Sequence, residues 1–87
     1  MKTRVFTFHS DPGHAWLEVT KQDLRGLFIV DDISGYSYMS GEKVYLEEDC
    51  DALKFLKSYQ LQYGKMKIDE KHMDGESFIR NLQSYKA

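Results

Sequence analysis

The chain has 87 residues, which predicts a single domain over 1–87 with little core left over for a deep cleft. Twelve Lys and Arg residues against fourteen Asp and Glu residues give a formal net charge of −2, so the basic excess needed for general nucleic-acid binding is missing. Hydrophobic residues make up 41% and aromatic residues 14% of the sequence, which is typical of a folded domain and excludes a disordered chain.

Membrane and secretion signals are missing from the sequence. No run approaches the roughly 20 apolar residues of a membrane span, and Met1 to Val5 lack the apolar region of a signal peptide. Cys50 is the only cysteine, so an internal disulfide is impossible, which agrees with a reducing compartment. We therefore expect a cytoplasmic protein that does not associate with a membrane.

The beginning of the chain predicts a β-hairpin. Residues 4–9 and 14–19 alternate apolar and polar side chains as strands do. Between them, Pro12 fixes φ near −65° and Gly13 tolerates the positive φ that a type II turn requires at the next position. The chain is therefore expected to reverse direction here, with a histidine on either side of the turn.

A short helix and a second hairpin are predicted next. Thr20 is a suitable N-cap, and Gly26 keeps the following helix short. Residues 35–40 and 43–47 are strand candidates joined by a turn around Gly41. The side chains that these elements are expected to bury are Leu24, Leu27, Phe28, Tyr36, Tyr38, Val44 and Leu46.

The longest helix is predicted from Asp49 or Asp51 to Tyr63, because apolar residues recur on one face and Gly64 is placed to end it. Residues 65–72 alternate charged and apolar side chains, which predicts an edge strand protected by charge. A short helix or ordered coil is expected in the tail from the spacing of Phe78, Ile79, Leu82 and Tyr85. The predicted fold is α+β, with a four- or five-stranded, mainly antiparallel sheet packed against one main helix and one or two short helices.

Cys50 lies where a strand is expected to lead into the longest helix. Amides at a helix N-terminus stabilise a thiolate, and many thiol hydrolases place their cysteine there. Acidic neighbours oppose this activation because they raise the thiol pKa; they are Glu47, Glu48, Asp49 and Asp51. A free cysteine is also commonly a buried core residue. The two interpretations are therefore a nucleophile and a small buried filler.

The segment from His14 to Val19 reads His-Ala-Trp-Leu-Glu-Val and resembles the histidine strand of transglutaminase-like thiol enzymes. In that family the cysteine precedes the histidine; because Cys50 follows it here, the order is closer to the circularly permuted papain-like group. The resemblance implies His14 as base, Cys50 as nucleophile, and Asp31 or Asp32 as the carboxylate that orients the base. It defines one functional alternative, a minimal cysteine-dependent hydrolase or transferase.

A metal site is the weaker chemical alternative. His9, Asp11, His14 and Cys50 all carry side chains that bind transition metals. Structural zinc sites show closely spaced pairs of Cys or His, which this set lacks. We therefore expect neither a metal nor another cofactor.

The side chains that favour an interface are aromatic and acidic. The sequence has six tyrosines, and Tyr and Trp are enriched where proteins bind one another, although they also fill small cores. The acidic run can meet a basic partner surface, or simply stabilise the start of a helix. The residues expected to bind are Trp16, Tyr36, Tyr38, Tyr45, Glu47, Glu48, Asp49 and Asp51. Because a recognised catalytic motif is absent, the expected function is protein binding, to a different protein or to a second copy of the chain.

Two segments carry a broader resemblance. His9-Ser10-Asp11-Pro12-Gly13-His14-Ala15-Trp16-Leu17 and Tyr45-Leu46-Glu47-Glu48-Asp49-Cys50-Asp51 look like short uncharacterised proteins encoded by bacteriophages and plasmids. The similarity spans most of the first sixty residues. It implies a mobile-element accessory protein in the cytoplasm of a bacterial host cell, where such proteins often bind and modulate a host or defence factor.

Overall fold

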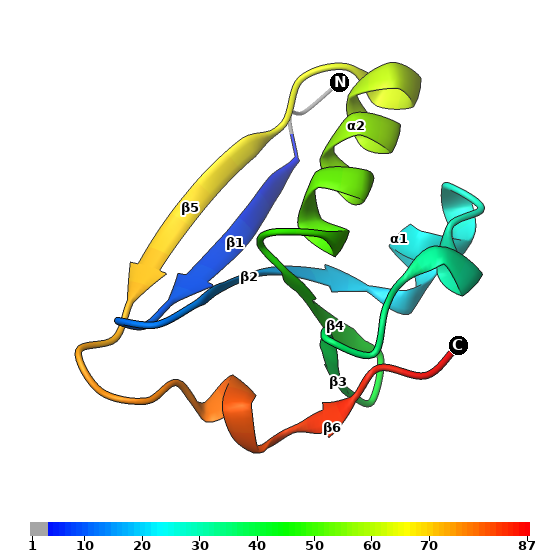
Figure 1. Cartoon of the computed structure of the whole chain (residues 1–87). Helices are drawn as coiled ribbons and strands as arrows, with labels where there is room; N and C mark the ends of the chain where they lie inside the picture. Colours follow the sequence, from blue (N-terminus) through cyan, green and yellow to red (C-terminus); the bar gives the residue numbers. More distant parts are fainter. Residues whose placement is uncertain (1–3) are drawn as a thin grey trace.

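A six-stranded mixed sheet forms the centre of the computed structural model, which describes residues 4–87 (Figure 1). In chain order the strands are β1 (Val5–Ser10), β2 (Ala15–Thr20), β3 (Tyr38–Ser40), β4 (Lys43–Glu47), β5 (Lys67–His72) and β6 (Gln83–Ser84). Their order across the sheet is β5-β1-β2-β4-β3-β6. The α+β class is confirmed. The predicted number of four or five strands is wrong, because the tail adds the two-residue strand β6 beside β3.

Strand β5 runs parallel to its neighbour β1, with Ser10 opposite His72 at the end of the register. The other four strand pairings of the described residues are antiparallel. A parallel neighbour requires a long crossover connection, and α2 (Asp51–Tyr63) supplies it between β4 and β5. The sheet is therefore mainly antiparallel, as expected, and β5 is the predicted charged edge strand.

Local chemistry accounts for the start of one helix and the end of the other. Helix α1 (Lys21–Gly26) has a capping box, in which the Thr20 hydroxyl accepts from the amide of Asp23 and the Asp23 carboxylate accepts from the amide of Thr20. Helix α2 has the predicted bounds and is followed by Gly64 at φ 83°. Two 3-10 turns complete the helical structure, at Val30–Asp32 and Phe78–Asn81.

The β1–β2 turn differs from the predicted type II turn, because Gly13 is not among the positive-φ glycines, which are Gly41 and Gly64. The turn is organised instead by the Asp11 carboxylate, which accepts from the amides of Gly13 and His14 at 3.0 and 2.9 Å. An aspartate that bonds to backbone amides two and three residues ahead closes the turn without a left-handed residue.

Two residues that the sequence pattern predicted as buried are exposed. Phe28 is 88% exposed and lies at φ 59°, immediately after α1, where its amide donates to the carbonyl of Arg25 and the next amide donates to the carbonyl of Leu24. This pair of bonds is the Schellman helix end, which usually has glycine at the left-handed position. Tyr36 is 78% exposed because the third strand begins only at Tyr38.

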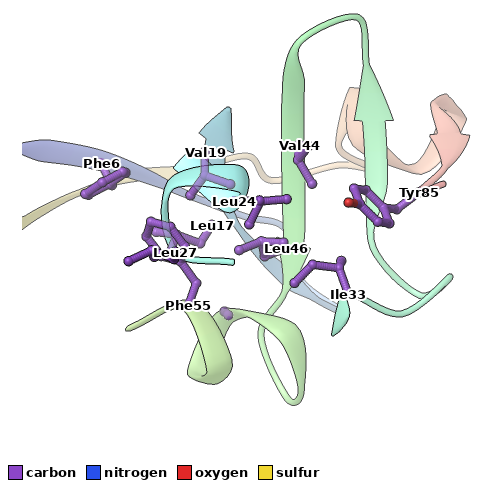
Figure 2. Packing of buried hydrophobic residues seen from close by; sticks show 11 residues of the cluster. Phe6, Leu17, Val19, Leu24, Leu27, Ile33, Val44, Leu46, Phe55 and Tyr85 are labelled. Carbon is purple, nitrogen blue, oxygen red and sulfur yellow. The ribbon is translucent and has the colours of Figure 1, made fainter. Parts of the chain in front are cut away.

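One face of the sheet packs against α1 and α2 and carries the main apolar core (Figure 2). Phe55 of α2 is fully buried, and its ring meets that of Phe6 edge-on at a centroid distance of 5.2 Å. The buried residues of this cluster are Phe6, Leu17, Val19, Leu24, Leu27, Ile33, Val44, Leu46, Ala52, Phe55 and Tyr85. Each large apolar side chain buried here contributes about 1.5–3 kcal/mol to folding.

The opposite face of the sheet is partly covered by the tail, and we call it the tail face. It is formed by side chains that alternate with those of the main core, because neighbouring residues of a strand point to opposite sides. Its buried cluster consists of Trp16, Tyr45 and Ile79, with Tyr38 and Leu82 packed against it. The tail then turns around the sheet edge, so that Tyr85 reaches the main core.

Candidate binding site on the tail face

An ion pair between Asp11 and Arg80 attaches the tail to the β1–β2 turn. The Arg80 Nε and Nη2 donate to the two carboxylate oxygens of Asp11 at 2.6 and 2.8 Å, and the amide of Ser77 donates to the same carboxylate at 3.0 Å. The Arg80 guanidinium beside Asp11 holds the pKa of that carboxyl far below its usual range, and the amides of Ser77, His14 and Gly13 lower it further. Asp11 is buried and therefore acts as a fixed anchor.

Beside this anchor lies a small cavity of about 160 Å³, which we call the aromatic pocket. It is lined by His14, Trp16, Tyr36, Tyr38, Glu47 and Arg80. Trp16 and Tyr38 meet edge-on with ring centroids 6.4 Å apart, and the Arg80 guanidinium lies 5.5 Å from the centre of the Trp16 ring. The aromatic walls are therefore fixed by packing, whereas Tyr36 projects into solvent at the rim.

An acidic run of three residues continues along the chain from the pocket wall, and we call it the acidic lip: Glu47, Glu48 and Asp49. Glu47 lines the pocket, and its carboxylate accepts from the amide of Asp49 at 2.7 Å. None of these three carboxylates takes part in an ion pair within residues 4–87. Because the charge of Arg80 is already matched by Asp11, the pocket and its lip carry uncompensated negative charge.

The remaining predicted binding residues lie away from the pocket opening. Tyr45 is buried beneath the tail, where its ring packs edge-on against Phe78. Asp51 is fully buried at the first position of α2, and its carboxylate accepts from both the amide and hydroxyl of Ser34 and from the hydroxyl of Ser37. Burial raises the pKa of Asp51, but these hydrogen bonds outweigh it and the net shift is downward. Asp51 thus ties α2 to the segment before β3.

Cys50 is exposed directly before α2, and its side chain makes no capping hydrogen bond. The interpretation as a buried filler is therefore wrong. His14 lies on the tail face, packed beside Trp16. Asp32 lies in the first 3-10 turn, and its main-chain carbonyl accepts a hydrogen bond from Lys54 Nζ. The hydrogen bonds of the described residues connect none of Cys50, His14 and Asp32 to one another.

Within residues 4–87, no group of three or more His, Cys, Asp or Glu side chains is placed to hold a metal ion. Two of the four candidates already have polar partners. His9 Nε2 lies 2.7 Å from a carboxylate oxygen of Glu18, and Asp11 is occupied by Arg80.

Sequence reasoning missed the contact between the β1–β2 turn and the tail. Arg80 follows its partner Asp11 by 69 positions, and nothing in the tail sequence marks it as an ion-pair residue. Gly13 matters for space, because a Cβ atom at this position would lie 2.7 Å from the Arg80 Nη2. The Asp-Pro-Gly sequence indicated a turn but not its contact with the tail.

Comparison of the chain with protein-family models, with curated proteins and with solved structures found no match. In the described part of the chain, no helix has both the length and the apolar character needed to cross a membrane. The shape and charge of the surface are therefore the main guide to function.

Proposed function

We propose that the protein binds another protein through the aromatic pocket and its acidic lip. The observation that carries this proposal is the exposure of Tyr36, a large ring held at 78% exposure beside a pocket with fixed aromatic walls. Aromatic rings at a partly open pocket are typical of the residues that dominate binding energy in protein interfaces. The remaining rim is polar, as in other interfaces.

The charge of the site favours a basic partner surface. Glu47 adds negative charge beside the rings of Trp16 and Tyr38, and Glu48 and Asp49 follow it in the chain. A lysine or arginine side chain of the partner gains both from the carboxylates and from the aromatic faces. A cavity of about 160 Å³ has room for the end of one such side chain. Binding through this site is expected to weaken as salt concentration rises.

The proposed biological setting is that of a bacteriophage or plasmid accessory protein whose partner is a host or defence factor. The two segments that resemble such proteins, 9–17 and 45–51, are neighbours in the sheet, because β2 pairs with β4 and places Trp16 opposite Glu47. The resemblance therefore concerns one continuous region, which supplies His14, Trp16 and Glu47 of the aromatic pocket.

Affinity capture from a bacterial lysate tests this proposal. We expect the wild-type protein to recover a specific partner, Tyr36→Ala to lose most of it, and Glu47→Gln to recover less at low salt. Tyr63→Ala is the matched control, because Tyr63 is an exposed tyrosine at the far end of α2 and outside the aromatic pocket. The proposal is wrong if no specific partner is recovered, or if Tyr36→Ala and Tyr63→Ala capture it equally.

Exposure of Cys50 favours a second candidate function, the cysteine-dependent hydrolase or transferase. An accessible thiol beside the first amides of a helix is placed to react. If His14 activates it, His14→Ala will slow alkylation of native Cys50, and Cys50→Ser will abolish any acyl transfer. If the aromatic pocket alone is responsible for function, Cys50→Ser will capture the partner as wild type does, and His14→Ala will leave the alkylation rate unchanged.

A further inference from the structure

A second and larger cavity lies on the tail side of β1 and β5, with a volume of about 480 Å³. We call it the histidine pocket, and its lining residues are His9, Ser10, Lys71, His72, Met73, Ser77 and Phe78. It shares no lining residue with the aromatic pocket. Its volume falls in the range of about 300–1,000 Å³ that is usual for small-molecule sites.

The parallel pairing of β5 with β1 creates this pocket. The register places Lys71 beside His9 and His72 beside Ser10, so basic side chains from the end of β5 meet polar side chains from the end of β1. The tail closes the remaining side with Phe78, whose ring packs edge-on against His9 at a centroid distance of 5.7 Å. Residues from three distant parts of the sequence therefore converge.

One wall of the pocket is apolar and only half covered. Phe78 and Met73 remain 48% and 46% exposed. The position of Phe78 is nevertheless fixed, because the amide of Ser77 is bound to the buried Asp11 carboxylate and Ile79 is fully buried. An apolar wall held open in this way is suited to a flat apolar group.

The side chains of Ser10 and His72 lie on the other side of the strands from those of His9 and Lys71, because neighbouring residues of a strand point to opposite faces. Ser10 Oγ and His72 Nδ1 lie 2.9 Å apart there and join the ends of β1 and β5. Lys71 is therefore the side-chain donor of these two strands on the pocket side.

The charge balance of the pocket is positive. Lys71 takes part in no ion pair within residues 4–87, and no acidic residue is among those that line the pocket. Glu18 lies 2.7 Å from His9 Nε2 and 3.6 Å from Lys43 Nζ, and the exposed Asp74 lies 3.6 Å from His72 Nε2. The ammonium of Lys71 is therefore the charge left to attract a ligand.

We propose that the histidine pocket binds a small organic anion, in which an aromatic ring rests against Phe78 and Met73 and a carboxylate, phosphate or sulfonate group is bound by Lys71. This chemistry uses the apolar wall and the ammonium group at once, since an apolar ligand would leave the charge of Lys71 unused and an inorganic anion would leave the apolar wall in water. The site is separate from the proposed protein-binding surface, and loss of partner capture leaves it unaffected.

Two matched probes test this site in the full-length protein: 1-anilinonaphthalene-8-sulfonate, and N-phenyl-1-naphthylamine, which has the same rings without the anionic group. We expect saturable fluorescence enhancement with the anionic probe, and an affinity roughly fivefold weaker in Lys71→Gln, as for loss of one partly exposed ion pair. The uncharged probe should bind wild type and Lys71→Gln equally. Lys67→Gln is the control, because Lys67 lies on the same strand outside the pocket.

Amide chemical shifts locate the bound probe. The expected shifts are those of Ser10, His72 and Ser77, while the amides of Trp16 and Tyr38 stay unchanged. Phe78→Ala is expected to weaken both probes without a change in the far-ultraviolet circular dichroism spectrum. The proposal is overturned if the anionic probe does not saturate, if Lys71→Gln and Lys67→Gln behave alike, or if the shifts cluster at Trp16.

Discussion

The two faces of the sheet are stabilised in different ways, although the same strands supply both. In β2, Leu17 and Val19 point into the core under α2, whereas Trp16 and Glu18 point to the tail face. The first face is a continuous apolar cluster. The second is held by one partly buried ion pair and by edge-on aromatic contacts, and both the aromatic pocket and the histidine pocket lie on it.

This difference separates folding from binding within a short chain. The larger apolar cluster lies beneath the helices, so the tail face can leave rings and charges partly exposed. The Asp11–Arg80 pair fixes the tail at one point without sealing the surface on either side. Substitutions on the two faces are therefore expected to have different consequences, global on one and local on the other.

The largest effect is expected from Phe55→Ala in the core. Phe55 is fully buried and packs on the rings of Phe6 and Tyr59, so the substitution removes apolar contacts and leaves a cavity. We expect the free energy of unfolding in urea to fall by about 3–5 kcal/mol. Leu53→Ala on the exposed side of α2 is the control and should change it by less than about 1 kcal/mol. Similar losses in the two variants would contradict the assignment of this face as the stabilising core.

A smaller effect is expected from Asp11→Asn, which removes the charge paired with Arg80 but keeps an oxygen for the turn amides. We expect the Tm at pH 7 to fall by roughly 5 °C. Hydrogen exchange should accelerate at Ser77 and Ile79, while the amides of the α2-covered core keep their protection. Asp74→Asn removes a fully exposed carboxylate and is the control. Equal acceleration in core and tail would show that the two faces are not separable.

The Tm of Asp11→Asn is also expected to depend on pH differently from that of the wild type. The Arg80 guanidinium lowers the pKa of Asp11 in the folded protein, so the pair stabilises the fold above the unfolded pKa of about 4 and loses that contribution as pH falls below it. The Tm of the wild type should therefore decline more steeply than that of Asp11→Asn between about pH 5 and about pH 2. Some decline remains in the variant, because the pKa of Asp51 is also lowered. Parallel Tm curves would contradict the role of the pair.

The features that were predicted correctly depend on residues close to one another in the sequence, and the features that were missed depend on residues far apart. Local signals gave α2 its bounds, since apolar spacing and Gly64 lie within the helix or beside it. The pairing of β6 with β3 and of Arg80 with Asp11 depends on partners far away in the sequence. For the candidate site, Trp16, Tyr36, Tyr38 and Glu47 were predicted and line one pocket, but the tail residue that completes it was not.

An intermediate effect on the tail is expected from Gly13→Ala. The new methyl group would lie 2.7 Å from the Arg80 Nη2, so the guanidinium must move while its bonds to Asp11 are strained. We expect a Tm decrease of a few degrees, smaller than in Asp11→Asn, together with a changed fluorescence of Trp16 beneath Arg80. Gly35→Ala has open space around the added methyl group and should leave both unchanged. If the two alanine variants behave alike, contact with Arg80 is not the reason for glycine at position 13.

The smallest effect is expected from Phe28→Gly. This variant tests whether the ring of Phe28, on the α2 side of the fold, is exposed for a different reason from the rings on the tail face. Phe28 is exposed because it occupies the left-handed position of the Schellman helix end. Its φ of 59° is strained for a bulky side chain. Glycine relieves this strain but is more flexible in the unfolded chain, so a net stabilisation of about 0.5 kcal/mol is expected in urea unfolding. Phe28→Ala keeps the backbone strain and should be nearly neutral. If Phe28→Gly is stabilised while partner capture and probe binding are unchanged, the exposed ring at position 28 reflects the helix end alone, and Tyr36 and Phe78 remain the exposed rings associated with binding.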